Sequence, residues 1–381
     1  MPLLPTSDYH PPCYVRHPHL QSIWPALFRP RACIPAQRSE LTTHDGDTIL
    51  VDRMFAAGFG DGACPPQGMA GAGCRSYCGQ GPKSGSERAT GPMAAASPAE
   101  QTASTGMSSA QRPPRQADGV VVISHGLEGD SRRRYVLGMA SALLADGWDI
   151  AARNFRGCGG QMNRKLPMYH SGETQDLHTV VMQCVAWGYR RIALVGFSMG
   201  GNQTLKYLGE DATRVPRQVV GAVAFSVPCD LVGSAAVLDR PSNRIYMEYF
   251  LRSLRRKMRA KAELFPGRLQ LDGLDAMRTF AEFDGQFTAP LHGFASAMDY
   301  WQQCGCGQFL EGVRVPTLLV NAQDDPFLSR SCFPRAEAAV SEHLFLEMPR
   351  WGGHVGFMQP GSNNRYWSDA RAVAFLHPLQ A

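Results

Sequence analysis

The sequence predicts an α/β fold, with a mostly parallel, doubly wound sheet covered by helices on both faces and a helical lid insertion. Three observations predict it. Short apolar runs alternate with helical stretches along most of the chain, the pattern of strands that pair in parallel. Residues 239–312 interrupt this alternation and are rich in helix formers. A glycine-rich pentapeptide, residues 196–200, joins one apolar run to the helical stretch after it.

Each element has its own sequence signal. Residues 39–55 are expected to form a hairpin, because apolar and polar residues alternate there and Asp45-Gly46 is a turn signal. Continuous apolar runs such as 119–124 are typical of strands that are buried on both faces. Strands are expected at 119–124, 148–154, 191–196, 219–227, 316–321 and 343–347. Helices are expected at 135–146, 174–188, 202–209 and 367–376.

The chain is expected to form a single domain, residues 1–381, that contains two interruptions. Between 57 and 117, Gly, Ala, Ser, Pro and Gln dominate and no apolar periodicity remains. Such a stretch cannot bury enough surface to offset its ordering entropy, so a disordered insert is expected there. The second interruption is the helical lid at 239–312.

The first helix of the expected lid is amphipathic. Four apolar side chains recur every four residues and form one stripe: Tyr246, Phe250, Leu254 and Met258. Basic residues fall mostly elsewhere on this helix: Arg252, Arg255, Arg256, Lys257, Arg259 and Lys261. We expect them to form a solvated basic face, with contact to a membrane surface or an anionic substrate as the alternative.

Composition narrows the class of protein. The formal charge of +5 over 381 residues is mild and does not indicate nucleic-acid binding. The eleven cysteines are scattered without a CxxC pair, which favours free thiols in a reducing compartment over a disulfide framework or a zinc site. No secretory or membrane-spanning run is evident, so a cytoplasmic location is expected. No metal or organic cofactor is implied.

The pentapeptide at 196–200, GFSMG, matches the pattern G-x-S-x-G. The pattern alone is weak, but here it follows an expected strand and precedes an expected helix, as in a nucleophile elbow. In that tight turn, side chains at Gly196 and Gly200 would collide with their surroundings. Ser198 is therefore the expected nucleophile, and a serine hydroxyl needs a base within hydrogen-bond reach.

Partners for this serine lie downstream in the order serine, acid, histidine. His354 is surrounded by glycines just after the last expected strand and is the expected base. Asp324 and Asp325 both follow the preceding strand, so the acid could be either. We favour Asp325, because the residue before Pro326 is biased toward extended geometry and the usual loop spacing places the acid there. Asp324 would then support the site or face solvent.

A tetrahedral intermediate also requires hydrogen-bond donors for its oxyanion. The backbone N–H of Met199, directly after the nucleophile, is one expected donor. The other is expected from the loop at 125–129, at the N–H of Leu127. His125 is expected to order this loop rather than to take part in catalysis.

The sequence resembles the YheT-like esterases of the α/β-hydrolase superfamily. The segments that carry the resemblance are residues 18–22, 125–129, 154–159, 169–176, 196–202, 205–210, 282–284, 288, 293–294, 324–327 and 352–357. The resemblance implies an α/β-hydrolase fold and a triad at Ser198, Asp325 and His354. It also implies a carboxylic ester hydrolase that acts on short-chain or lipid-like esters. The insert at 57–117 departs from the family pattern, and we expect no counterpart of the membrane anchor of animal members.

The leading expectation is therefore a cytoplasmic serine esterase whose partner is a small-molecule or lipid ester, without nucleic acid. A lipase or phospholipase at a membrane surface is the alternative if the basic lid helix meets lipid. From a different class, the chain could be a catalytically silent hydrolase fold that serves as a ligand receptor.

Overall fold

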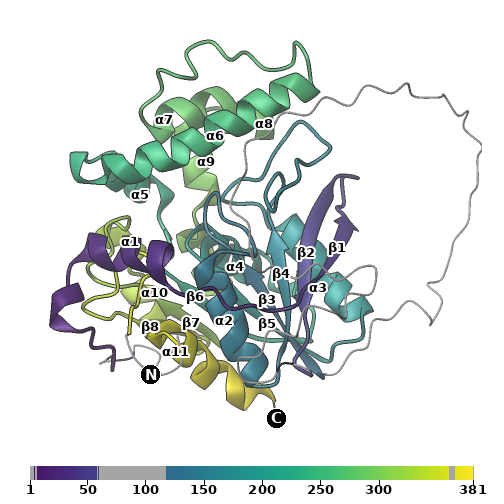
Figure 1. The fold of residues 1–381 in the computed structure, drawn as a ribbon, viewed down its shortest axis with the longest axis vertical. Helices are drawn as coiled ribbons and strands as arrows, with labels where there is room; N and C mark the ends of the chain where they lie inside the picture. The colour runs from purple at the N-terminus through teal and green to yellow at the C-terminus, as the bar shows by residue number, and fades with distance from the viewer. Residues whose placement is uncertain (1–3, 5–6, 58, 60–116, 360–364, 381) are drawn as a thin grey trace, which may run out of the picture.

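The computed structural model describes residues 4, 7–57, 59, 117–359 and 365–380 (Figure 1). The disordered insert that we expected at 57–117 lies almost wholly outside these residues. Eight described strands form one sheet in the order β1-β2-β4-β3-β5-β6-β7-β8. They are β1 Gln37–Thr42, β2 Thr48–Met54, β3 Gly119–Ser124, β4 Asp149–Asn154, β5 Arg191–Phe197, β6 Val219–Phe225, β7 Thr317–Val320 and β8 Leu344–Glu347. From β4 to β8 neighbouring strands are parallel, whereas β1 and β2 run antiparallel at one edge.

The expected hairpin is present as β1 and β2. Its turn contains Gly46 at φ +81°, a left-handed conformation that glycine adopts without steric cost. The backbone N–H of Thr43 donates to the carbonyl oxygen of Asp47 across the turn at 2.9 Å. The hairpin joins the parallel strands through antiparallel pairing of β2 with β4.

Helices bury both faces of the sheet, as the continuous apolar runs predicted. On β3, Val121 and Ile123 pack with one core cluster, which includes residues of α2 (Arg134–Ala145) and α11 (Trp367–Leu376). The alternating residues Val120 and Val122 pack with a second cluster on the opposite face. That cluster includes residues of α3 (Gln175–Ala186) and α4 (Met199–Glu210). Two further helices are α1 (Pro18–Phe28) and α10 (Arg335–Val340).

The helical insertion lies between β6 and β7 and contains no strand in its described residues. Its helices gather at the top of the molecule in the view of Figure 1. They are α5 Leu231–Leu238, α6 Arg244–Leu264, α7 Phe280–Phe283, α8 Ala289–His292 and α9 Ala297–Cys304, with a π-helical turn at Asp284–Thr288. No helix in the described ranges, the 21-residue α6 included, is long and apolar enough to cross a membrane.

The solvated basic face that we expected on α6 is only partly correct. Arg255 is buried and donates to the carbonyl oxygens of Leu274 and Met277. Lys261 is buried and donates to the carbonyl oxygen of Asn163, and burial lowers its pKa to about 8. These cations stabilise the fold by donating hydrogen bonds to backbone carbonyl oxygens of other segments. Of the six basic residues expected on this face, Arg252, Arg256 and Arg259 are exposed.

The cysteines follow the expectation of free thiols with one correction. Seven described cysteines are free. Cys13 is exposed, and the other six are buried: Cys158, Cys184, Cys229, Cys304, Cys306 and Cys332. Cys33, in contrast, is disulfide-bonded.

Candidate active site

Ser198 occupies a strained turn between β5 and α4. Its φ of +53° and ψ of −120° lie outside the usual regions for a residue with a side chain. The turn is fixed on both sides, because the Ser198 N–H donates to Phe225 O at 2.8 Å and its carbonyl accepts from Asn202 N–H at 3.0 Å. Helix α4 therefore begins at Met199, three residues before the helix start that we expected.

The glycines around Ser198 are required by close approach, as we expected. A Cβ on Gly196 would lie 2.5 Å from the carbonyl oxygen of Gly200. A Cβ on Gly200 would lie 2.4 Å from the carbonyl oxygen of His125. Both contacts are shorter than any tolerable packing distance and involve backbone atoms that cannot move aside. The turn that exposes Ser198 therefore depends on glycine at these two positions.

The structure brings Ser198, His354 and Asp325 together. His354 Nε2 lies 2.9 Å from Ser198 Oγ, and Nδ1 lies 3.0 and 3.1 Å from the two carboxylate oxygens of Asp325. Because Nδ1 faces a carboxylate, we assign its proton there, which leaves Nε2 free to accept from the serine hydroxyl. The Asp325 side chain is fully buried, and that of His354 is 11% exposed.

Asp324, the alternative acid, has a different environment. Its Oδ1 accepts from the backbone N–H of Gly353 at 2.9 Å, within the loop that carries His354. Its Oδ2 is buried without a hydrogen-bond partner in the described part of the chain. Burial raises the pKa of Asp324 to about 6, and the negative charge of Asp325 adds to this rise. Asp325, and not Asp324, is thus the carboxylate beside His354.

The two residues whose backbone N–H groups we expected to stabilise an oxyanion, Leu127 and Met199, lie beside the serine. Leu127 and Met199 line the same cavity as Ser198. A Cβ on Gly126 would lie 3.3 Å from the Cβ of Ser198, so the Leu127 loop passes directly beside the serine. Among the described residues, neither the Leu127 N–H nor the Met199 N–H donates to a protein acceptor.

His125 orders this loop, as we expected. Its Nε2 accepts from the backbone N–H of Phe155 at 3.2 Å, so Nδ1 carries the proton and donates to Gly126 O at 2.7 Å. Burial lowers the pKa of His125 to about 3, and the imidazole is therefore neutral. A neutral, doubly hydrogen-bonded ring has no free nitrogen for proton transfer.

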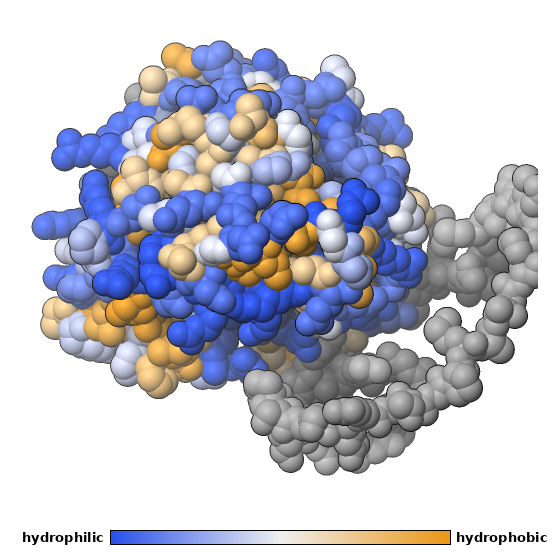
Figure 2. All heavy atoms as spheres, turned by 90° about the horizontal axis from the view of Figure 1, so that it is seen from above, coloured by the Kyte–Doolittle hydropathy of each residue, from blue (hydrophilic) through white to orange (hydrophobic). Residues whose placement is uncertain are grey.

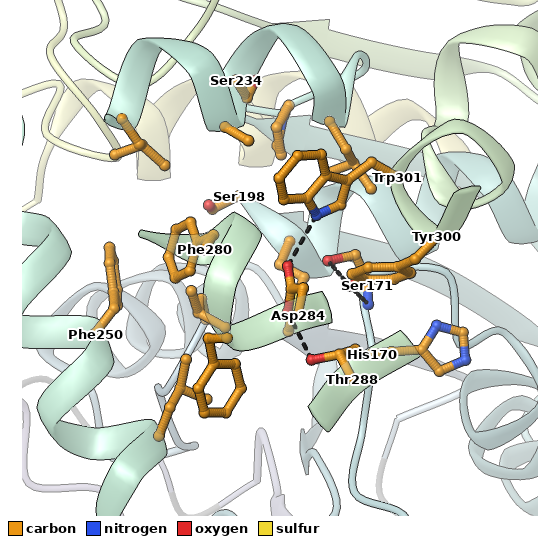
Figure 3. A pocket seen from close by; sticks show the side chains of 18 of the residues that line it. His170, Ser171, Ser198, Ser234, Phe250, Phe280, Asp284, Thr288, Tyr300 and Trp301 are labelled. Carbon is orange, nitrogen blue, oxygen red and sulfur yellow. Dashed lines mark hydrogen bonds between the residues drawn. The ribbon is translucent and has the colours of Figure 1, made fainter. Parts of the chain in front are cut away.

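A cavity of about 120 Å³ opens beside Ser198 and His354 (Figure 3). Its wall is mainly apolar and aromatic, and the insertion supplies much of it: Phe250, Leu254, Phe280, Phe283 and Trp301. Such a cavity suits the apolar part of a small ligand. Within the described residues, no group of three or more His, Cys, Asp or Glu side chains is placed to hold a metal ion.

Comparison with known proteins agrees with this architecture. The family model described as alpha/beta hydrolase fold matches residues 119–360, well over half of the chain. The chain belongs to the α/β-hydrolase fold family. The match begins at β3 and extends past His354. It therefore spans the turn that carries Ser198 and the loops that carry Asp325 and His354.

Curated relatives place this α/β-hydrolase in the YheT-like group. YheT of Escherichia coli (strain K12), named as a candidate esterase, is 34% identical over 65% of this chain and 72% of its own. Phospholipase ABHD3 of Mus musculus is 28% identical over 63% of this chain and 58% of its own. The chain thus spans less than two thirds of the mouse protein. The solved structure of the Pyrococcus furiosus esterase Pf2001 shares the fold, with a TM-score of 0.51, 15% identity and 91% coverage of both chains.

Sequence reasoning missed the contact between the histidine loop of this α/β-hydrolase and helix α1. Ser22 Oγ accepts from the backbone N–H of His354 at 2.8 Å and donates to Pro18 O at 2.7 Å. Phe327 packs flat on the imidazole, with ring centroids 4.1 Å apart. The only sequence signal for this contact was that Ser22 belongs to segment 18–22, one of the segments that carry the family resemblance. That resemblance assigned no role to Ser22.

A second missed feature ties the Leu127 loop to the insertion. The buried Glu128 carboxylate accepts from Lys257 Nζ of α6 at 2.7 Å and from the hydroxyls of Ser253 and Tyr169. Its backbone adopts φ +54°, and its carbonyl accepts from Arg133 at 2.6 Å. The residue next to Leu127 is therefore fixed by helix α6 as well as by the α/β-hydrolase core.

Proposed function

We propose that this protein is a serine hydrolase that cleaves carboxylic esters, short-chain or lipid-like, through an acyl-enzyme on Ser198. The observation that carries the proposal is the 2.9 Å approach of His354 Nε2 to Ser198 Oγ, with Asp325 on the other imidazole nitrogen. Ser198 Oγ attacks the ester carbonyl while His354 takes its proton. His354 then returns that proton to the departing alcohol.

The second half of the reaction repeats this sequence with water as the nucleophile. His354 removes a proton from water as the water oxygen attacks the acyl carbonyl on Ser198. The bond between the carbonyl carbon and Ser198 Oγ then breaks, His354 returns the proton to Oγ, and the carboxylic acid leaves. Asp325 fixes the imidazole tautomer and stabilises the imidazolium that forms in each half. The N–H groups of Leu127 and Met199 donate to the oxyanion, and each such donor stabilises the transition state by about 3 kcal/mol. Relatives named as an esterase and a phospholipase support ester cleavage.

Kinetics of two serine variants test the proposal. Turnover of nitrophenyl esters of increasing acyl length should fall by roughly 10⁴ to 10⁶ in Ser198→Ala. Ser234 is the matched control, because it lines the same cavity but its hydroxyl lies 3.2 Å from Cys332 Sγ, away from the imidazole. Ser234→Ala should retain turnover within about tenfold of wild type. A Ser198→Ala rate near that of Ser234→Ala would contradict the proposal.

A second candidate is a lipase or phospholipase at a membrane surface. Helix α6 exposes Ile245 (75%), Tyr249 (52%), Arg252 and Arg256, which share one helical face. Tyr249 and the two arginines line a groove of about 510 Å³ between α6 and the core. Seen from above, the end at which the insertion lies, the molecule shows apolar patches among hydrophilic residues (Figure 2). An apolar anchor beside arginines suits a surface of anionic lipid.

Vesicle flotation distinguishes this candidate. The protein should float with vesicles that contain phosphatidylserine, and Arg252→Glu with Arg256→Glu should abolish flotation. Arg190→Glu with Arg217→Glu is the matched control, because both exposed arginines lie just before the amino ends of β5 and β6, at the opposite end of the strands from Ser198. Equal flotation of the two double variants, or none for wild type, would exclude the membrane-surface candidate.

The non-enzyme alternative, a silent fold that acts as a receptor, has an equally direct test. A fluorophosphonate probe reacts only with an activated serine. We expect it to label the wild-type protein and to leave Ser198→Ala unlabelled. Absence of labelling on folded wild-type protein would favour the receptor over the hydrolase.

A further inference from the structure

One carboxyl group lies in the mainly apolar wall of the cavity beside Ser198. Asp284 begins the π-helical turn Asp284–Thr288, between α7 and α8. A π-helical turn changes the direction of the side chains relative to the flanking helix, and such turns are frequent at functional sites. Figure 3 shows the Asp284 side chain between those of Trp301 and Thr288, among the side chains that line the cavity. The triad does not use this group.

The Asp284 carboxylate is held by two neutral donors. Thr288 Oγ1 donates to Oδ1 at 2.6 Å, and Trp301 Nε1 donates to Oδ2 at 2.8 Å. An ionised carboxylate has about four acceptor positions, so half of its capacity is unused. In the described part of the chain no Lys or Arg forms an ion pair with it. Burial raises its pKa to about 6, although the two donors oppose the rise.

Other titratable groups on the cavity wall do not neutralise this charge. Burial lowers the pKa of His170 to about 3, so this imidazole is neutral at physiological pH. Burial raises the pKa of Tyr169 and of Tyr300 well above the usual value, so both phenols stay protonated. His354 faces Asp325 and Ser198. At pH 7 the cavity therefore presents a partly buried carboxylate without a cation, and such an unpaired charge is unfavourable.

We propose that this cavity takes esters that carry an ammonium group, primary or quaternary, and that Asp284 is the residue that binds it. The inference rests on the proposed ester hydrolysis and names its substrate class. Either kind of ammonium ion would neutralise the carboxylate, and a primary one would also donate hydrogen bonds to its free acceptor positions. Aromatic rings of Phe280, Phe283 and Trp301 line the same cavity and attract a cation to their faces. A neutral ester of equal shape would leave the carboxylate unpaired.

An isosteric pair of esters tests the proposal. Butyrylcholine and 3,3-dimethylbutyl butyrate have nearly the same shape, and only the first carries a positive charge. Calorimetry on the Ser198→Ala protein measures binding of each without turnover. Butyrylcholine should bind at least about tenfold more tightly, and Asp284→Asn in that background should reduce the preference to about twofold or less. Asparagine keeps the size and acceptor oxygen of Asp284 and removes its charge.

The control and the kinetic experiment separate charge recognition from a structural role. Glu263→Gln removes an exposed charge from the same insertion and should leave the tenfold preference intact. In the otherwise wild-type enzyme, Asp284→Asn should raise KM for butyrylcholine alone. Equal binding of both esters, no binding of either, or a preference that survives Asp284→Asn would overturn the inference. Binding without turnover in the wild-type enzyme would instead overturn only the proposed hydrolysis.

Discussion

The hydroxyl of Ser22 in helix α1 accepts a hydrogen bond from the backbone N–H of His354, although 332 residues separate the two along the chain. Helix α1, which is not part of the sheet, thus fixes the loop that follows β8 and carries His354. Neighbouring backbone conformations require this support, because Val355 and Phe357 have φ of +58° and +42°. Residues with side chains adopt such angles only where the surrounding structure imposes them.

Loss of the Ser22 hydroxyl should slow catalysis without unfolding the protein. Besides its bond to Pro18 O, Ser22→Ala removes the hydrogen bond to the His354 N–H, worth about 1 kcal/mol, and loosens the His354 loop, so kcat should fall by roughly three- to tenfold. Thr179→Ala is the matched control. Its hydroxyl also donates to a carbonyl four residues earlier, but on an exposed helix face away from the site. Equal turnover of both variants, measured on one nitrophenyl ester, would contradict a role for Ser22 in positioning His354.

Two neighbouring aspartates should differ sharply in their effect on turnover. Asp325→Asn cannot hold the required imidazole tautomer, so kcat should fall on the order of 10³ to 10⁴. Asp324→Asn keeps an oxygen that can accept from Gly353 N–H, and its kcat should stay within about tenfold of wild type. Steady-state kinetics of the two variants, measured side by side, give the two kcat values to compare. The reverse order of effects would assign the acid to Asp324.

Asp324 should also make stability depend on pH. Its folded-state pKa is raised to about 6, above the ordinary value of 3.8, so ionisation opposes folding. Stability from this group is present below about pH 4 and is lost as pH rises through 6. Asp324→Asn should therefore stabilise the protein near pH 8 by about 1 to 2 kcal/mol and have little effect near pH 4. Urea unfolding at both pH values measures the change in stability. Equal stabilisation by Asp324→Asn at pH 8 and pH 4 would contradict the raised pKa of Asp324.

The Glu128–Lys257 pair should matter more than an exposed ion pair of similar geometry. Glu128→Gln leaves Lys257 buried without its charge partner, and the free energy of unfolding should fall by about 3 kcal/mol. Turnover should fall as well, because Glu128 adjoins Leu127. Asp275→Asn, which removes the partner of Arg259 on the surface, should change stability by less than about 1 kcal/mol. Equal destabilisation in the two variants would show that helix α6 does not fix the Leu127 loop.

Much of the fold was predictable because its signals are local. Strands such as β3 and β5 are continuous apolar runs, and the hairpin turn is marked by Asp45-Gly46. The order of Ser198, the acid and His354 along the chain, together with glycines whose Cβ atoms would collide, predicted which side chains meet. Parallel strands bring their carboxyl ends to one edge, so loops that follow different strands converge there.

Features that depend on packing between distant segments were not predictable. Arg255 is buried because carbonyl oxygens of Leu274 and Met277 lie beside it, and nothing in the helical periodicity of α6 indicates this. The π-helical turn that directs Asp284 into the cavity likewise has no local sequence pattern. Choice between Asp324 and Asp325 rested on the proline that follows, whereas the structure separates them by their hydrogen-bond partners.

Direct detection of an acylated Ser198 tests the central claim most sharply. The enzyme is mixed with nitrophenyl butyrate, quenched in acid during turnover, digested and analysed by mass spectrometry. We predict that one butyryl group is found on the peptide that contains Ser198, and that none is found in Ser198→Ala. Turnover with no acyl group on Ser198, or a butyryl group on the same peptide in Ser198→Ala, would contradict the acyl-enzyme mechanism.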